Sequence, residues 1–323
     1  MIGITATLLW LSLRGLKLEG AHEGQSTFDL IWGAWSKSNK FYLVLMAVIL
    51  LLSHVLRAER WRMLLEPSGN KGKFSNSFLS VMVGYLINLA IPRGGEVSRC
   101  YNLFKLEDTP VEVSFGTVVL ERLVDVLCLL LLIIISFVVE WDKLELFISS
   151  LNFSSGEGFT VSPLLIVALL GVGGLVLLGY LFRNNPKLKK LFSGFKEGIL
   201  SVFRLKNKWA FIGYSMAIWG LYFLMSYVVM LAFDETAVLG IRAVLTIFAI
   251  GAIAMAAPLP GGAGSYHLLL PMGLVSLYHM DRADAVAFVF IFHAWQTLVL
   301  IIVGVVSLII SYWLIRWRQR QIK

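Results

Sequence analysis

The chain has 323 residues, of which 58% are hydrophobic and only 15% are charged, and its formal net charge is +8. Water-soluble domains carry about 25% charged residues, so this composition excludes a soluble enzyme, a secreted disulfide scaffold and a disordered adaptor. The basic residues fall in short clusters between apolar runs, which is typical of a polytopic membrane protein and not of a nucleic-acid-binding protein.

Apolar runs follow one another along the whole chain. They cover residues 1–13, 41–56, 74–91, 113–139, 161–182, 209–233, 240–257, 263–278 and 285–315. A helix needs about 20 residues to cross the hydrocarbon core of roughly 30 Å, so the runs that begin at 113, 161, 209 and 285 are long enough to span it. We interpret the first run as a short or tilted span, because it lacks the basic start and the cleavage site of a signal peptide.

The charges of the loops predict the orientation. Most of the Lys and Arg residues lie in segments 57–73, 183–208 and 316–323, which should face the cytoplasm. Segments 140–160 and 234–242 carry mainly acidic residues and should lie outside. The basic loop 183–208 forms either an amphipathic helix on anionic headgroups or a solvated connection. Both termini are predicted to lie in the cytoplasm.

Two segments are predicted to be re-entrant helical hairpins. An inside loop and an outside loop must be joined by an odd number of crossings, and this parity requires two of the apolar runs to enter the membrane and return. The first hairpin, 74–107, turns at Pro92–Glu96, and the second, 240–279, turns at Pro258–Gly262. Such broken helices are tolerated where they line a cavity or are buried in protein. The alternative is an ordinary bundle with two proline-glycine kinks.

These elements predict an all-α polytopic membrane protein with a single transmembrane domain over residues 1–323. About six full spans and the two hairpins occur in the same order twice, with opposite directions through the membrane. Residues 1–139 and 161–315 are therefore predicted to form an inverted repeat. In transporters built in this way, the substrate site lies near the membrane midplane, where the repeats meet.

Charged residues gather where the first hairpin precedes the following span. Charges at membrane depth cost several kcal/mol, which makes them functional candidates and implies that they have partners. Glu121 is expected about 12 Å inside its span, and Asp125 shares its helix face, whereas Arg122 is rotated by about 100°. One carboxylate is therefore expected to hold an arginine of the hairpin. The ion-pair candidates are Glu96, Glu121, Arg122 and Asp125. The alternative role of this set is a structural lattice.

Glycine-rich segments open the return helix of each hairpin. Helix N-termini carry unpaired N–H groups that attract anions, and glycine allows close approach to the backbone. With the nearby arginines, these segments predict a site for a phosphate or carboxylate headgroup; the alternative is simple turn formation. The sequence has no Walker lysine motif, which excludes a nucleotide P-loop. The predicted headgroup-binding residues are Arg93, Gly94, Gly95, Arg99, Gly261, Gly262 and Gly264.

Further polar residues are expected to line a groove between the hairpins. They are Asn88, His267, His293 and Gln296. His293 and Gln296 share a face deep in the last span, and a structural hydrogen bond is the alternative role for a membrane histidine. The sequence contains no catalytic motif of recognisable spacing, and its two cysteines provide no metal site. No catalytic residue, metal or cofactor is therefore predicted.

Three motifs, in this order, resemble a known family. They are Asn88 with Pro92-Arg93-x-Gly95-Glu96-x-x-Arg99, then Gly116-Thr117 with Glu121-Arg122-x-x-Asp125, and then Pro258-x-Pro260-Gly261-Gly262-x-Gly264. Together with Arg60-Trp61 and His293-x-x-Gln296, they cover residues 40–312. The pattern resembles the flippase-like family, also called the lysylphosphatidylglycerol synthase transmembrane region, which is the membrane half of the bacterial multiple peptide resistance factor.

This resemblance implies a membrane domain that moves aminoacylated phospholipid between leaflets and, in other relatives, roles around lipid-linked glycans. We expect a stand-alone form without the aminoacyl-transferase half. The expected partners are membrane lipids (anionic, aminoacylated or polyprenyl-linked) and a separate lipid-modifying enzyme, and not nucleic acid. The expected function is a lipid translocase of a bacterial inner membrane. The alternatives are an integral-membrane transferase that uses a polyprenyl-linked donor and a non-transporting assembly partner.

Overall fold

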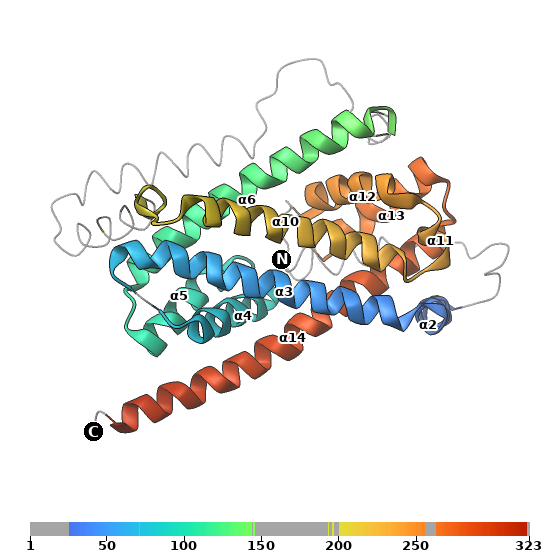
Figure 1. Ribbon diagram of the computed structural model, residues 1–323. Helices are drawn as coiled ribbons and strands as arrows, with labels where there is room; N and C mark the ends of the chain where they lie inside the picture. Colours follow the sequence, from blue (N-terminus) through green and yellow to red (C-terminus); the bar gives the residue numbers. More distant parts are fainter. Residues whose placement is uncertain are drawn as a thin grey trace, which may run out of the picture.

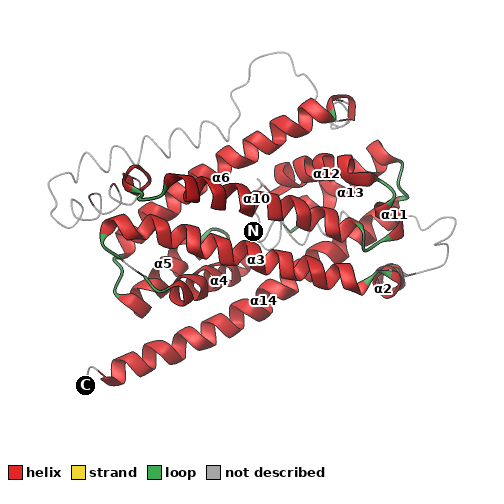
Figure 2. Cartoon of the chain, in the orientation of Figure 1, coloured by secondary structure: helices red, strands yellow, loops and turns green. Residues whose placement is uncertain are grey.

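The computed structural model describes residues 26–70, 72–143, 200–255 and 263–321, with positions 145, 193 and 196. This part of the chain consists of helices and loops, without strands (Figure 2). The helices are α2 (Thr27–Lys37), α3 (Lys40–Leu65), η2 (Glu66–Ser68), α4 (Phe74–Ala90), α5 (Gly94–Glu107), α6 (Val111–Val139), η3 (Ser201–Arg204), α10 (Lys208–Met230), α11 (Asp234–Ala237), α12 (Gly240–Met255), α13 (Ser265–Tyr278) and α14 (Arg282–Gln321).

The predicted all-α class is confirmed for the described residues. The predicted spans 1–13 and 161–182 lie outside the described residues, as do most of the loop 183–208 and the turn Pro258–Gly262. The number of spans, the inverted repeat and the re-entrant character of the hairpins therefore stay predictions.

Within the described chain, three helical segments are long and apolar enough to cross a membrane. They are Lys40–Ser68 with 29 residues, α10 with 23 and α14 with 40. At about 1.5 Å per residue, even 23 residues extend about 35 Å, which exceeds the hydrocarbon core. The fourth long helix, α6, has 29 residues and carries charged side chains in its first half. These four long helices pack together in one bundle.

The two hairpins flank a pair of long central helices. Helices α3 and α10 lie side by side along the bundle (Figure 1). The α4–α5 hairpin packs at one end and the α12–α13 hairpin at the other, while α14 runs past both towards the C-terminus (Figure 1). The largest apolar core contains side chains of α3, α4, α10, α12, α13 and α14. This core therefore reaches both hairpins, through α4 in the first and through α12 and α13 in the second.

The α4–α5 hairpin is closed by proline and packed through glycine. Pro92 disfavours a helical backbone in the residue before it, so α4 ends at this point, and Arg93 turns the chain with a φ of 61°. A Cβ on Gly95 would lie 2.1 Å from the carbonyl oxygen of Gly84. Asn88 Oδ1 accepts the N–H of Gly95 at 2.8 Å. The two helices of the hairpin thus pack backbone against backbone.

Asn102 connects this hairpin to α14, and its removal should destabilise the fold. Its buried Nδ2 donates to Ser80 Oγ on α4 and to Ser311 Oγ on α14, both at 3.1 Å. We expect Asn102→Leu to lower the free energy of unfolding by about 1–3 kcal/mol, because buried hydroxyls lose their donor. Thermal unfolding of the purified protein measures the effect. The double variant Ser80→Ala/Asn102→Leu should recover part of the loss, and an unchanged stability of the single variant would contradict this role.

Candidate functional site

A buried cluster of charged side chains joins α3, α5 and α6. Arg57 Nη1 lies 2.5 Å from Glu121 Oε1 and 2.8 Å from Asp125 Oδ2. Arg60 Nη2 lies 2.6 Å from Asp125 Oδ1, and Arg99 Nη2 lies 2.7 Å from Glu121 Oε2. These five residues form the ion cluster, in which Glu121 is shared between arginines of α3 and α5, and Asp125 is held by the two arginines of α3.

Helical spacing explains how the ion cluster assembles. Arg57 and Arg60 are three residues apart on α3, and Glu121 and Asp125 are four apart on α6, so each pair shares one helix face. All five side chains are at most 10% exposed. Buried charges of this kind require partners and hydrogen bonds. Among the described residues, three guanidinium groups face two carboxylates, which leaves one positive charge.

Helix α10 supports the ion cluster with hydroxyl groups. Arg57 Nη2 donates to Tyr222 Oη at 2.9 Å, and Arg60 Nη1 donates to Ser215 Oγ at 3.1 Å. Both acceptors come from the middle of α10, which packs along α3. The cluster therefore links α3 and α10 to the α4–α5 hairpin and to α6.

Trp61 explains two of the short motifs noticed in the sequence. The guanidinium carbon of Arg99 lies 4.2 Å from the ring centroid of Trp61, which is a cation–π contact. The indole Nε1 of Trp61 donates to Thr117 Oγ1 at 2.9 Å. The dipeptide Arg60-Trp61 and Thr117 thus position the arginine of the hairpin against α6.

A second ion pair lies at the accessible edge of the ion cluster. Arg122 Nη2 is 3.0 Å from Glu96 Oε1, and Arg122 Nη1 is 4.0 Å from Asp125 Oδ2. The side chains of Arg122 and Glu96 are 40% and 19% exposed, in contrast to the buried cluster. Arg122 and Glu96 form the rim pair. Arg93, at the tip of the hairpin, is exposed and makes no ion pair with any residue that the structure describes.

The ion cluster includes two residues that the sequence assigned elsewhere. The prediction that Arg57 and Arg60 lie in a cytoplasmic loop is wrong, because α3 continues to Leu65 and buries both side chains. Their charges are compensated by α6, which follows much later in the chain. The three-residue spacing of these arginines, directly after an apolar run, was the signal for a continuing helix face. The carboxylate that holds the hairpin arginine is Glu121.

The N–H groups at the start of α5 have partners within the hairpin. Gly94 donates to the carbonyl oxygen of Ile91 at 2.9 Å, and Gly95 donates to Asn88 Oδ1 at 2.8 Å. A headgroup at these two glycines would have to displace these bonds. The side chains of the arginines, rather than these backbone groups, are therefore the available donors at the first hairpin.

The second hairpin brings two predicted histidines together. The ring centroids of His267 and His293 are 4.7 Å apart, and Tyr266 lies 5.6 Å from His293. The N–H of Gly264, which has a φ of 99°, donates to His267 Nδ1 at 3.4 Å. Gln296 is half-buried about one turn further along α14. Two of the predicted residues, Gly261 and Gly262, lie outside the described residues.

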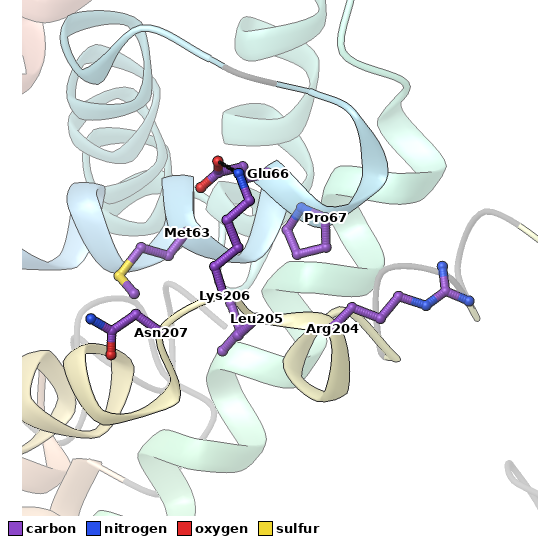
Figure 3. Close-up of a pocket in the computed structure, with 7 residues that line it drawn as sticks. All are labelled: Met63, Glu66, Pro67, Arg204, Leu205, Lys206 and Asn207. Carbon is purple, nitrogen blue, oxygen red and sulfur yellow. Dashed lines mark hydrogen bonds and ion pairs between the residues drawn. The ribbon is translucent and has the colours of Figure 1, made fainter.

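Pockets occur outside the ion cluster. The pocket in Figure 3 has a volume of about 100 Å³ and lies between η2 and η3. It is lined by Met63, Glu66, Pro67, Arg204, Leu205, Lys206 and Asn207. Lys206 Nζ reaches across it to Glu66 Oε1 at 2.8 Å, whereas Arg204 points away from it (Figure 3). A second pocket, of about 260 Å³, lies beside His267 on α13 and Arg282 on α14. Lys206, the cation that extends across the first pocket, is already paired with Glu66, so that pocket is a poor headgroup site.

Comparisons with known proteins extend this description. Residues 1–304 match the model of a family described as lysylphosphatidylglycerol synthase TM region. The chain is 34% identical over 146 residues to a UPF0104 membrane protein of Methanocaldococcus jannaschii, which covers 43% of this chain and 42% of that protein. It is 25% identical over 299 residues to the glycosyltransferase AglD of Haloferax volcanii, which covers 81% of this chain and 48% of that protein. The chain spans about half the length of these curated relatives. No solved structure matches it.

Proposed function

Because the chain belongs to the lysylphosphatidylglycerol synthase TM region family, we propose that it is a lipid translocase that moves a phosphate-bearing headgroup between leaflets. The observation that carries this proposal is a cluster of arginines and carboxylates within the spanning helices, with an excess of positive charge and an accessible rim. The membrane and the side on which the termini lie stay predictions.

The position of the ion cluster along its helices supports a role at membrane depth. Arg57 lies 17 residues after the start of α3 and eight before its end, which corresponds to about 26 Å and 12 Å along the helix. Glu121 lies ten residues into α6, or about 15 Å. Ionised side chains at such depth are expensive and mark substrate or ion pathways. The five ionised side chains of the ion cluster therefore support a passage for charged groups.

The chemistry of the cluster and the rim pair favours an anion. The ion cluster and the rim pair together contain four guanidinium groups and three carboxylates, which leaves one positive charge. The Nε–H of each arginine has no acceptor among the groups described. Guanidinium groups bind phosphate oxygens through paired hydrogen bonds. A phosphate at the rim would therefore compensate the excess positive charge and offer acceptors to the accessible Arg122. The arginines are Arg57, Arg60, Arg99 and Arg122.

The buried and the accessible residues have different proposed roles. The ion cluster is buried and holds the hairpin against α6, so we assign it to positioning. Arg122 and the exposed Arg93 are accessible, so we assign them to the first contact with the headgroup. The phosphate takes the place of Glu96 on Arg122 while the acyl chains stay in lipid. Movement of the hairpins then carries the headgroup past His267 and His293, as alternating access requires.

Arg122→Ala should lower headgroup exchange in proteoliposomes at least tenfold while the protein stays folded. The reason is that this variant removes the accessible guanidinium without breaking the ion pairs of the buried cluster. Exchange of headgroup-labelled phospholipid between leaflets measures the effect, and Arg93→Ala should reduce it in the same direction. The matched control is Arg62→Ala, whose side chain is 35% exposed and pairs with Glu59 on α3. Equal exchange by the control and by folded Arg122→Ala would refute this assignment.

A transferase is the second candidate, and the similarity to a protein named glycosyltransferase favours it. That similarity covers about half of the named protein, so the proposal requires a direct test of turnover. A transferase would consume a polyprenyl-linked donor and release a product, and the ion cluster would then be a scaffold. Turnover without headgroup exchange would favour this candidate. Neither activity in a folded protein would favour a non-transporting assembly partner.

A further inference from the structure

Helix α2 lies across the bundle. Figure 1 shows it end-on at the end where α3 begins, whereas α3 and α14 run along the bundle. Ser38 and Asn39 are extended, with ψ angles of 146° and 107°, so α2 does not continue into α3. Ser26 Oγ accepts the N–H of Asp29 at 3.1 Å, and Asp29 Oδ2 accepts the N–H of Ser26 at 3.3 Å. This capping box gives α2 its own defined start.

The inner face of α2 is fixed to the start of α14 and to α3. Leu30 is 3% exposed and packs with Ala283 and Ala287 of α14. The rings of Trp35 and Trp295 have centroids 5.5 Å apart. The indole of Trp295 in turn donates to a backbone carbonyl of α3 at 2.8 Å. The orientation of α2 is therefore set by packing, and its outer face is presented in a defined direction.

That outer face has an aromatic ridge beside polar residues. Phe28 and Trp32 are four residues apart, 71% and 60% exposed, and their rings are stacked with centroids 6.2 Å apart. Asp29, Ser36 and Lys37 are exposed beside them. A short helix with aromatic and charged side chains on adjacent strips fits the boundary between lipid chains and water.

Exposed aromatic residues mark two levels along the bundle. Phe41 at the start of α3 and Trp141 just after α6 are 68% and 58% exposed, and α3 begins and α6 ends at the same end of the bundle as α2 (Figure 1). Trp209 at the start of α10 and Trp313 near the end of α14 are 82% and 69% exposed, and α10 begins and α14 ends at the opposite end (Figure 1). Aromatic belts of this kind mark the two membrane interfaces. Helix α2 is level with the first belt.

We propose that α2 is an interfacial helix that binds the lipid surface at the end of the bundle where α3 begins. Phe28 and Trp32 insert between the lipid headgroups, while Asp29 and Lys37 stay in water. Through Leu30 and its contacts, this binding fixes the first part of α14 relative to that leaflet. The inference does not depend on the translocase proposal, because it concerns a surface away from the ion cluster.

Spin labels on the full-length chain in vesicles of phosphatidylcholine and phosphatidylglycerol test this inference. Phe28→Cys and Trp32→Cys carry the label on the ridge, and Lys37→Cys is the matched control on the same helix. All three positions are exposed, so labelling leaves the core intact. The parent chain, whose Cys100 and Cys128 are buried, provides the background.

The two ridge labels should collide several times more often with oxygen, which concentrates in lipid, than with a water-soluble nickel chelate. The control label should show the reverse preference. Nickel access at all three positions would overturn the inference, because α2 would then lie in water. Ridge labels that are immobile and shielded from both reagents would also overturn it, because a protein partner, such as a second copy of the chain, would then cover the ridge.

Discussion

Glu121→Gln should destabilise the protein by about 3–5 kcal/mol, or prevent it from folding. Glu121 is fully buried and compensates Arg57, Arg60 and Arg99, with nitrogen–oxygen distances of 2.5, 3.5 and 2.7 Å. Removing one partner of a buried ion pair leaves uncompensated charge in a medium that cannot solvate it. Here three guanidinium groups would be left with Asp125 as their carboxylate. Thermal or denaturant unfolding of the purified protein measures the loss.

Two further variants make this test specific. Glu59→Gln removes a carboxylate that pairs with Arg62 but is 22% exposed, and it should cost less than about 1 kcal/mol. In the double variant Arg99→Gln/Glu121→Gln, one positive and one negative charge leave together. Part of the lost stability should therefore return, as a coupling energy between the two sites. If Glu121→Gln and Glu59→Gln had equal stabilities, the ion cluster would not hold the helices together as we describe.

Gly95→Ala should open the α4–α5 hairpin. The added Cβ would lie 2.1 Å from the carbonyl oxygen of Gly84 and 2.6 Å from the side-chain amide of Asn88. Backbone cannot yield as a flexible side chain can, so the helices must separate. Overpacking of this kind costs typically 1–3 kcal/mol, and we expect about 3 kcal/mol or more because the clash is with backbone. Separation would also move Arg99 away from Glu121.

The matched control is Gly213→Ala. Gly213 lies on α10, and a Cβ at this position meets no atom within 4 Å. The substitution should leave stability unchanged or raise it by up to about 1 kcal/mol through better helix propensity. Comparing the melting temperatures and the size-exclusion profiles of both variants checks the prediction. A Gly95→Ala protein that unfolds like the wild type would mean that the hairpin is packed less closely than described.

Hydropathy predicted the positions of two long helices closely, because the length of an apolar run is a local property of the sequence. The run 209–233 corresponds to α10, Lys208–Met230, and the run 285–315 lies within α14, Arg282–Gln321. The hairpin turn at Pro92 was also predictable, because proline fixes its own φ and restricts its neighbour. In each case the determinant is local in the sequence.

The features that sequence reasoning missed depend on distant contacts or on mixed composition. Arg57 looks like a loop charge until Glu121 and Asp125, more than 60 positions away, are placed beside it. The hydrogen bond from the N–H of Gly95 to the side chain of Asn88 is visible only in the folded hairpin, where α5 packs against α4. Helix α2 was not predicted, because its polar and aromatic residues are interspersed along the sequence and form no apolar run.

The sequence also could not show which charged residues are accessible for binding and which are buried. It placed Arg93 and Arg99 among the headgroup-binding residues and Arg122 among the ion-pair residues. In the structure, Arg99 is buried against Glu121, Arg122 pairs at the rim with Glu96, and Arg93 is exposed. Burial depends on the surrounding helices, so it can be assigned only when the packing is known.

The central claim is that this protein moves phosphate-bearing headgroups, and leaflet exchange in proteoliposomes tests it most directly. Two sets of labelled lipids are compared, and each phosphate-bearing lipid is matched with a phosphate-free lipid that has the same hydrophobic chain. One set carries zwitterionic, anionic, aminoacylated or polyprenyl phosphate headgroups, and the other carries an uncharged sugar without phosphate. We predict protein-dependent exchange of at least one phosphate-bearing class and none of the phosphate-free lipid. Exchange that is equal with and without phosphate, or absent for every class with a folded protein, would contradict the account.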